Sequence, residues 1–316
     1  MDNFIFSLSV VAPLFFLMAG GYFTRQIKFV SDNFLSEMNK FVFKLLLPLM
    51  LFFNIQSSFG AQFDNSKLLL GAALAILLIV LLSICFVPLF VRKRSQQGSI
   101  IQAIYRSNFL IYGIPLASGL YGSEAVAYIS LMMAFMIPIF NILAVIILSI
   151  YSESNTRGVN IKSISTDIIK NPLIIGCFGG MAAAIFHIDI PNFAAAPLSE
   201  FANMGGPLAL FVMGGQFRFK SLQNNIVKVA STSLLRLIIV PVVCLCIFIQ
   251  LGYRDAELAV FLCLFATPTA VSSYIMAENM GCDGELAGQI VVMTTICSSV
   301  TIFAFIFFLR MFGYLN

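Results

Sequence analysis

The stretches SNFLIYGIPLASGLYG (residues 107–122) and FATPTAVSSY (residues 265–274) are two apolar runs that each contain a helix-breaking proline. Proline removes a backbone hydrogen-bond donor and clashes with the carbonyl group four residues earlier, but it suits the first position of a helix. We therefore predict that each run is a break followed by a half-helix, which begins at Pro115 in one run and at Pro268 in the other. Simple proline kinks are the alternative interpretation.

The residues beside each proline favour a break. Gly113 provides a flexible joint before Pro115, and Thr267 is a good N-cap directly before Pro268. At about 1.5 Å per residue, both breaks fall near the middle of a bilayer. The first N–H groups of a helix lack partners and carry a partial positive charge. Two such helix starts facing each other would form a pocket for a small anion such as a carboxylate, with no arginine at its centre.

The composition of the whole chain places these runs in a membrane. Of the 316 residues, 60% are apolar and 10% are charged, and the mean hydropathy is +0.98. A soluble domain is about 45–50% apolar and about 25% charged, which excludes an ordinary soluble enzyme, a disordered chain and a secreted disulfide scaffold. The predicted fold class is an all-α polytopic membrane protein. Hydropathy predicts ten transmembrane helices, at residues 4–24, 33–56, 67–91, 100–121, 124–150, 171–187, 194–216, 225–250, 256–278 and 285–312.

The positions of lysine and arginine predict the orientation of these helices. Fourteen of the 18 cations, Arg106 among them, fall in one alternating set of loops and flanks. Three fall in the other set, and Arg236 lies inside a helix. The positive-inside rule assigns the side with 14 cations to the cytoplasm. We therefore expect a multi-pass protein of the cell membrane with both termini outside.

The chain also divides into two similar halves. A polar connection separates a first five-helix repeat (1–155) from a second one (171–316), with residues 156–170 as a cytoplasmic loop. Because five is an odd number, the second repeat enters the membrane inverted. The sequences PLMLFF (48–53) and PLALFV (207–212) support the repeat, since each contains a proline 35 residues after an earlier one. The predicted architecture is two inverted five-helix repeats in which helices 4 and 9 are broken where they cross.

Four stretches in order resemble the auxin efflux carrier family, which includes bacterial small-organic-acid permeases and plant PIN-type carriers. They are MNKFVFKLLLPL (38–49), NFLIYGIPL (108–116), PLALFVMG (207–214) and ATPTAVSSYIMAE (266–278). The resemblance implies a fold similar to bile-acid sodium symporters, with a scaffold domain of helices 1, 2, 6 and 7 and a transport domain of helices 3–5 and 8–10. It also implies elevator-like alternating access and an organic anion at the crossing of helices 4 and 9.

The resemblance and the polar residues near the two breaks predict a substrate site. The half-helix starts would bind a carboxylate, hydroxyl and amide groups would add directional hydrogen bonds, and Tyr112 would form a wall. The predicted substrate-binding residues are Asn108, Tyr112, Gly113, Pro115, Thr267, Pro268, Thr269, Ser272 and Ser273.

Four further residues are candidates for ion coupling or for the substrate pathway. Glu200 is either a proton or cation carrier or an acid that favours a helix start. Asn203 stands where plant carriers have an acid, and Glu278 is a further titratable candidate. Arg236 either holds a helix interface through a carbonyl or an acid, or attracts an anion along its path. The sequence leaves open whether Na⁺, H⁺ or neither drives transport.

The function predicted from these features is secondary transport of a small organic anion, either a mono- or a dicarboxylate. A membrane sensor that binds its ligand without flux, and a passive channel, are the alternatives. The sequence contains no HExxH, GxGD or P-loop motif, so we expect no enzymatic activity, metal or cofactor. The expected partners are the substrate, the lipid bilayer and a second copy bound through the scaffold domain, and we expect no nucleic acid.

Overall fold

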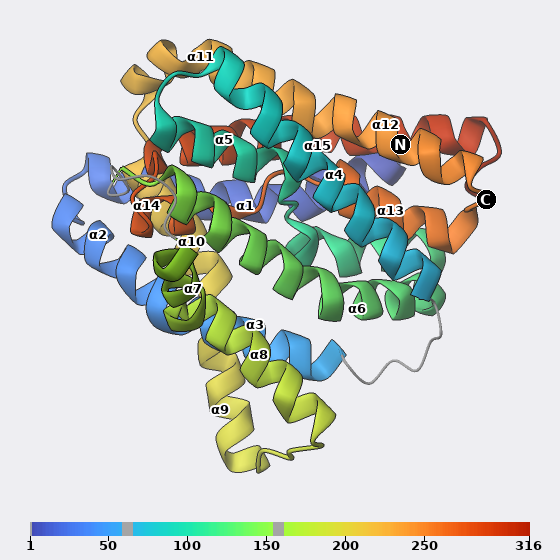
Figure 1. Ribbon diagram of the computed structural model, residues 1–316, viewed down its shortest axis with the longest axis horizontal. Helices are drawn as coiled ribbons and strands as arrows, with labels where there is room; N and C mark the ends of the chain where they lie inside the picture. The colour runs from blue at the N-terminus through green and yellow to red at the C-terminus, as the bar shows by residue number, and fades with distance from the viewer. Residues whose placement is uncertain (1, 59–65, 154–160) are drawn as a thin grey trace.

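The computed structural model describes residues 2–58, 66–153 and 161–316, and this part of the chain is helical apart from short connections (Figure 1). Two π-helical segments, Val42–Leu46 and Leu235–Ile239, join α2 to α3 and α11 to α12 without a break. The helices are α1 (Asp2–Gln26), α2 (Asp32–Phe41), α3 (Leu47–Ser58), α4 (Ser66–Phe90), α5 (Arg94–Tyr105), α6 (Phe109–Tyr151), α7 (Ile161–Lys170), α8 (Pro172–Ile185), α9 (Asn192–Asn203), α10 (Gly205–Gln216), α11 (Phe219–Leu234), α12 (Val240–Gln250), α13 (Asp255–Ala266), α14 (Val271–Asn279) and α15 (Gly284–Met311).

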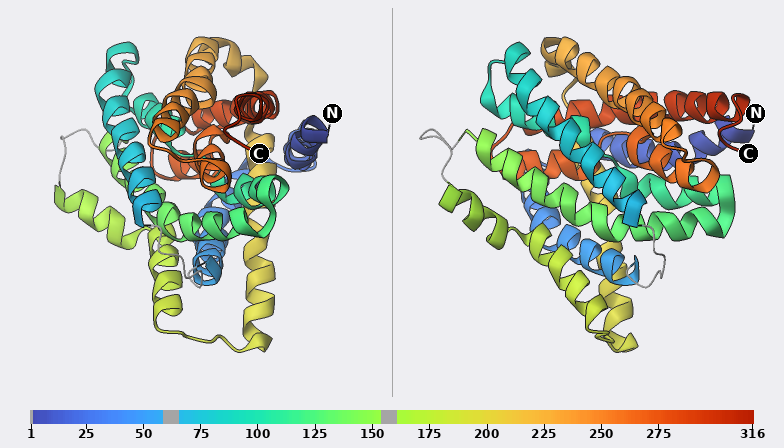
Figure 2. Two further views of the ribbon diagram at one scale, coloured as in Figure 1. Left: turned by 90° about the vertical axis from the view of Figure 1, so that its right-hand side faces the viewer. Right: turned by 45° about the vertical axis from the view of Figure 1, so that its right-hand side comes forward.

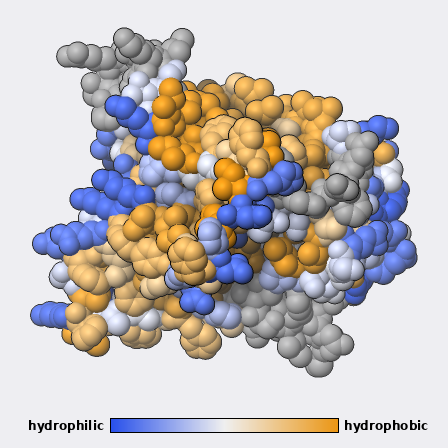
Figure 3. Space-filling view, turned by 90° about the horizontal axis from the view of Figure 1, so that it is seen from below, coloured by the Kyte–Doolittle hydropathy of each residue, from blue (hydrophilic) through white to orange (hydrophobic). Residues whose placement is uncertain are grey.

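Several of these helices have the length and the surface of membrane-spanning segments. Figure 3 shows a face on which hydrophobic residues cover a broad area between hydrophilic residues near the left and right edges. Large apolar side chains exposed on the outside need a lipid environment rather than water. The chain is therefore a polytopic helical membrane protein, as predicted. The described helices long and apolar enough to cross a bilayer are Asp32–Ser58, Ser66–Phe90, Phe109–Tyr151, Ser221–Gln250 and Gly284–Met311, and Pro172–Ile185 is a shorter apolar helix.

The first break does not lie where the sequence predicted it. The chain leaves the helical conformation at Arg106–Asn108, and Pro115 lies inside α6. Arg106 is extended and Ser107 pairs with Thr269, far away in the sequence, whereas a membrane helix can absorb a single proline. The second break does contain Pro268, but α14 begins three residues later, at Val271.

A second interruption separates the two halves of α6. Tyr121 has φ −136° and ψ 17°, and Gly122 has φ 60° and ψ −139°. A residue with a side chain rarely adopts this left-handed φ, so glycine allows the chain to turn there. The turn agrees with the predicted separation of segments 100–121 and 124–150.

Glycines allow two pairs of helices to pack with their backbones in contact. A Cβ atom on Gly21 of α1 would overlap the carbonyl oxygen of Phe211 in α10. In the same way, a Cβ atom on Gly176 of α8 would overlap the carbonyl oxygen of Pro48 in α3. Small residues drive such contacts in membranes, where burying apolar surface gives no advantage over lipid. The contacts join α1 to α10 and α3 to α8.

The molecule has two distinct ends. Figure 1 places the start of α1 and the end of the chain at the right, and both views in Figure 2 keep them together. At the left lie α2 and the starts of α11 and α15. We call this the basic end, after Lys93, Arg218 and Lys228. The helices α8 and α9 project from the rest of the structure and are joined at their tip by residues 186–191.

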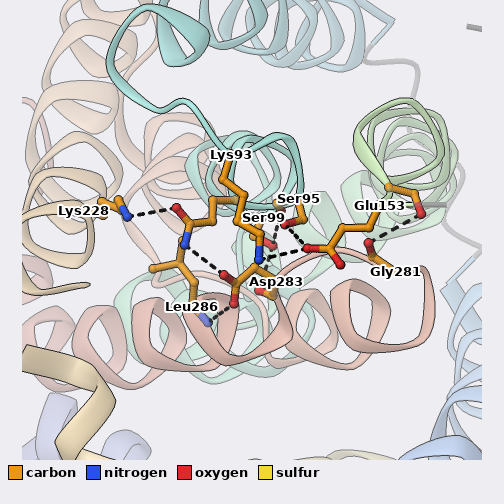
Figure 4. A network of polar contacts seen from close by, with 10 residues as sticks. Lys93, Ser95, Ser99, Glu153, Lys228, Gly281, Asp283 and Leu286 are labelled. Carbon is orange, nitrogen blue, oxygen red and sulfur yellow. Dashed lines mark hydrogen bonds and ion pairs between the residues drawn. The ribbon is translucent and has the colours of Figure 1, made fainter. Parts of the chain in front are cut away.

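A network of polar contacts joins four helices at the basic end (Figure 4). Lys93 Nζ lies 2.9 Å from a carboxylate oxygen of Glu153, which also accepts a 2.9 Å bond from Ser95 Oγ. Asp283 caps α15 by accepting from Leu286 N at 2.9 Å, and its own N–H donates to Ser95 O at 3.2 Å. The bond to Glu153 raises the pKa of Lys93 above its ordinary value of 10.5. The bonds from Lys93 and Ser95 lower the pKa of Glu153 below 4.5.

Candidate functional site

The two breaks meet and pair with each other. Ser107 and Thr269 form an isolated antiparallel bridge between the end of α5 and the start of α14. Asn108 N donates to Pro268 O at 2.7 Å, and Ala270 N donates to the carbonyl oxygen of residue 106 at 3.2 Å. The paired segments, residues 106–108 and 267–270, therefore satisfy part of each other's backbone inside an otherwise helical bundle.

Arg236 of the π-helical segment before α12 fixes these segments from one side. Its side chain is fully buried. Nε and Nη2 donate to Thr267 O at 3.1 and 2.7 Å, Nη1 donates to Ile104 O at 3.3 Å, and Nη2 also approaches Leu264 O at 3.4 Å. The last carbonyl groups of a helix lack intrahelical partners and carry a partial negative charge. One guanidinium thus caps the ends of both α5 and α13, which corresponds to the interface-holding role that the sequence allowed.

Thr269 is held in place by two further hydrogen bonds. Its Oγ1 donates to Ala103 O at 2.9 Å, and its backbone N–H donates to Thr294 Oγ1 at 3.3 Å. Both bonds anchor the second paired segment, to α5 and to α15. Thr269 therefore acts as part of the frame and does not present its hydroxyl group to a cavity.

A cavity of about 60 Å³ lies on the other side of the paired segments. Its polar wall includes Ser107, Asn108 and Ser272, together with Arg106 and Asn141. The remaining wall is apolar and comes from α3, α6, α8 and α10, with Leu47, Met50, Ile137, Phe140, Leu173 and Ala209. We call this space the central cavity.

Two helix starts open into the central cavity. Phe109 and Leu110 are the first residues of α6, Val271 and Ser272 are the first residues of α14, and all four line the cavity. Their N–H groups have no intrahelical acceptor because of their position in the helix. Each start also contributes the positive end of a helix dipole, which favours an anion.

Unpartnered polar atoms lie in the same wall. Asn108 Nδ2 and Ser107 Oγ are buried and have no hydrogen-bond partner among the residues that the structure describes. Each side chain is only 4% exposed, and both line the central cavity. Buried donors are normally satisfied, so these atoms are available to a ligand with acceptor oxygens.

The structure separates the nine predicted substrate-binding residues into two groups. Asn108 and Ser272 line the central cavity. The hydroxyl groups of Thr267 and Ser273 are buried away from it. The seven residues that do not line the cavity are Tyr112, Gly113, Pro115, Thr267, Pro268, Thr269 and Ser273. Pro268 still contributes through its carbonyl group, which positions Asn108.

The central cavity has an arginine in its wall, whereas the pocket predicted from the sequence had none at its centre. Arg106, which the sequence analysis assigned to a cytoplasmic flank, is 4% exposed and lines the central cavity. The hydropathy pattern missed this because α5 already starts at Arg94, so its 12 residues carry the chain about 18 Å inward before Arg106. The polar stretch SQQ (95–97) hid the start of this helix.

A second cavity, of about 330 Å³, adjoins the central cavity, and we call it the outer cavity. Asn203, a predicted pathway residue, lines it together with Asn54 and Ser57. Glu200 does not, and it is exposed on α9. The residues that this outer cavity shares with the central cavity are Met50, Leu110, Ile111 and Gly206.

A third cavity, of about 350 Å³, lies at the basic end and is lined by Glu278, another predicted pathway residue, and by Tyr274 and Gln216. A polar cluster beside it joins α14 to α2 and α10. Asn39 Nδ2 donates to Tyr274 Oη at 3.0 Å, Tyr274 Oη donates to Gln216 Oε1, and Asn279 Nδ2 donates to Asn39 Oδ1. No lining residue is common to this cavity and the central one.

The geometry can be compared with known proteins. A model of the family described as "Membrane transport protein" matches residues 6–306. The chain belongs to this family. The resemblance to auxin efflux carriers seen in the sequence is thereby confirmed.

Relatives of this family member carry the names of transporters. A protein of Rhizobium meliloti (strain 1021) named "Putative malonate transporter" is 22% identical over 306 residues, which cover 95% of both chains. An "Uncharacterized transporter" of Methanothermobacter thermautotrophicus is 22% identical over 307 residues, or 95% of this chain and 97% of that one. "Auxin efflux carrier component 5" of Arabidopsis thaliana is 24% identical over 213 residues, or 55% of this chain and 60% of the plant protein.

Proposed function

We propose that the protein is a secondary transporter of a small organic anion, a mono- or dicarboxylate, which binds in the central cavity. The observation that carries this proposal is the convergence of two helix starts with the unpartnered Nδ2 of Asn108 on one buried space. Carboxylate oxygens are acceptors for all of these donors. The name of the Rhizobium meliloti relative, which specifies malonate, supports the same class of substrate.

The proposed mechanism is elevator-like alternating access in a fold of two inverted five-helix repeats. The scaffold group would be α1–α3 and α8–α10, and the transport group α4–α6 and α11–α15. The glycine contacts described above join helices within the scaffold group. The paired segments and the network of Figure 4 join helices within the transport group. A homodimer formed through the scaffold group completes this proposal.

The cavities support one state of such a cycle. The outer cavity shares four lining residues with the central cavity, whereas the cluster around Tyr274 connects the two groups at the basic end. With the basic end in the cytoplasm and both termini outside the cell membrane, this state faces outward. An anion would enter beside Asn203 and reach the start of α6.

Transport assays with the full chain in proteoliposomes test the proposal. Radiolabelled acetate, lactate, malonate and succinate are offered with and without imposed sodium, proton and voltage gradients, which also identifies the coupling ion. We expect saturable uptake and counterflow of at least one of them. Binding without flux would indicate the sensor, and unsaturable flux without counterflow would indicate the channel.

Two substitutions locate the site. Asn108→Ala removes the unpartnered donor and should lower uptake at least about tenfold, as expected for a lost hydrogen bond to a charged group. Asn192→Ala, at the exposed start of α9, is the matched control and should leave uptake unchanged. Equal uptake by both variants would contradict a site at the central cavity.

A further inference from the structure

Arg106 lies on the wall of the central cavity with only neutral partners. Nη2 donates to Asn141 Oδ1 at 2.7 Å, and Nη1 lies 2.6 Å from Met276 Sδ. The Gln102 amide, in the orientation that satisfies both of its polar atoms, accepts from Nη1 at 3.1 Å. Arginine has five N–H donors, so donors remain beyond these three contacts.

No carboxylate among the described residues forms an ion pair with Arg106. The other buried arginine, Arg236, has different surroundings. Its guanidinium donates to backbone carbonyl groups at two helix ends, and it does not line the cavity. A guanidinium buried in a membrane protein without a counter-charge is costly. The wall of the central cavity therefore carries one positive charge that an incoming anion can neutralise.

The geometry points to the Arg106 guanidinium as the counter-ion of the transported carboxylate, an inference that rests on the proposed function. One carboxylate group accepts from the free donors of Arg106, in the paired geometry that guanidinium groups favour. The two helix starts contribute about half a charge each. Together with Arg106 this makes a total of about +2, so the site is matched to a short dicarboxylate and favours it over the monocarboxylate of the same length.

The size of the cavity limits the ligand further. One water needs roughly 10–15 Å³ of such space, and the central cavity offers about 60 Å³. A chain of few carbon atoms is therefore the expected cargo.

The test measures the KM of saturable uptake by the full chain in proteoliposomes, with malonate as the dianion and propionate as the monoanion of equal carbon number. In Arg106→Gln, we expect the KM for malonate to rise by about 10- to 100-fold, because malonate loses a charged hydrogen-bonding partner. The preference for malonate over propionate should fall with it. Arg106→Lys keeps the charge, so it should partly restore the KM for malonate and the preference for malonate over propionate.

Two asparagine-to-aspartate substitutions separate binding from folding. Asn141→Asp introduces a carboxylate beside the guanidinium at the position of the 2.7 Å contact. It should raise the KM as Arg106→Gln does, while the melting temperature stays the same or rises. Asn192→Asp adds the same charge at the exposed start of α9, away from the cavity, and should leave the KM unchanged.

The outcomes distinguish this inference from the proposed function. If Arg106→Gln is folded and retains the wild-type KM and preference, the role of Arg106 is overturned and the transport function stands. If Arg106→Gln does not fold, wild-type uptake by Asn141→Asp overturns the role instead. If the wild-type protein takes up none of the carboxylates, the proposed function itself fails.

Discussion

Arg236 donates two hydrogen bonds to the carbonyl oxygen of Thr267, from Nε at 3.1 Å and from Nη2 at 2.7 Å. These bonds satisfy the end of α13 at the point where the chain becomes extended. The same guanidinium reaches Ile104 O near the end of α5. One side chain therefore holds the helix ends at both breaks, and this contact gives the first prediction.

Arg236→Met should destabilise the protein by about 3 kcal/mol, because the buried carbonyl groups of two helix ends lose a charged partner. The measurement is the melting temperature of the purified protein in detergent. Arg254→Met is the matched control, since Arg254 also donates to two carbonyl groups, Ile249 O and Tyr253 O, but is exposed. A similar loss in both variants would contradict the special role of Arg236.

Adjacent glycines in α1 should respond oppositely to alanine. Gly21→Ala should lower the melting temperature, since its Cβ would overlap Phe211 O and force α1 away from α10. Gly20→Ala has no atom within 4 Å of the new Cβ and should be neutral or slightly stabilising, because alanine is a better helix former. The prediction fails if the two variants melt at the same temperature.

The Lys93–Glu153 pair predicts a dependence of stability on acid. Because the pKa of Glu153 is lowered in the folded state, the folding stability that this carboxylate contributes is fully present above pH 4.5. It is lost as the pH falls through the folded pKa. The pKa of Lys93 is raised, so the stability that its ammonium group contributes persists up to pH 10.5 and is lost only above that pH. Thermal unfolding from pH 7 to pH 3 should show a larger loss in the wild type than in Glu153→Gln. The difference should be small because Glu153 is exposed. If the melting temperatures of the two proteins fall in parallel with pH, the pair makes no contribution to stability.

Tyr274→Phe should loosen the contact between the proposed scaffold and transport groups. It removes the hydroxyl group that accepts from Asn39 and donates to Gln216. In a variant whose seven native cysteines are replaced, a single cysteine at Ala209, in the wall of the central cavity, should then react faster with a membrane-impermeant thiol reagent applied from the basic end. Tyr253→Phe, far from this cluster, should leave the rate unchanged. If both variants react at the same rate, the cluster does not influence the conformational equilibrium.

The sequence predicted the existence of both breaks and the position of one. Pro268 lies in the observed break, but the first break lies at Arg106–Asn108 instead of Pro115. Local propensity could not locate it, because the partners that hold this segment extended are Thr269 and Arg236, more than 100 residues away in the chain.

The assignment of Arg106 to a cytoplasmic flank was wrong for a related reason. Fourteen cations on one side gave a consistent topology, and Arg106 was counted among them because it borders an apolar run. Hydropathy averages over a window and does not distinguish a flanking arginine from one carried inward by a preceding polar helix turn. Asn108 was found because it matches the first crossover of the auxin efflux carrier family, which the sequence resembles.

The bridge between Ser107 and Thr269 has a consequence for how the protein is made. The start of α6 is synthesised more than 150 residues before the segment that pairs with it. A nascent chain that has not yet reached Thr269 leaves the backbone of Ser107 without its partner, inside a lipid environment that offers no substitute. We therefore expect this segment to be covered by another helix or by the insertion machinery until the second half arrives, and the proposed anion site to form only then.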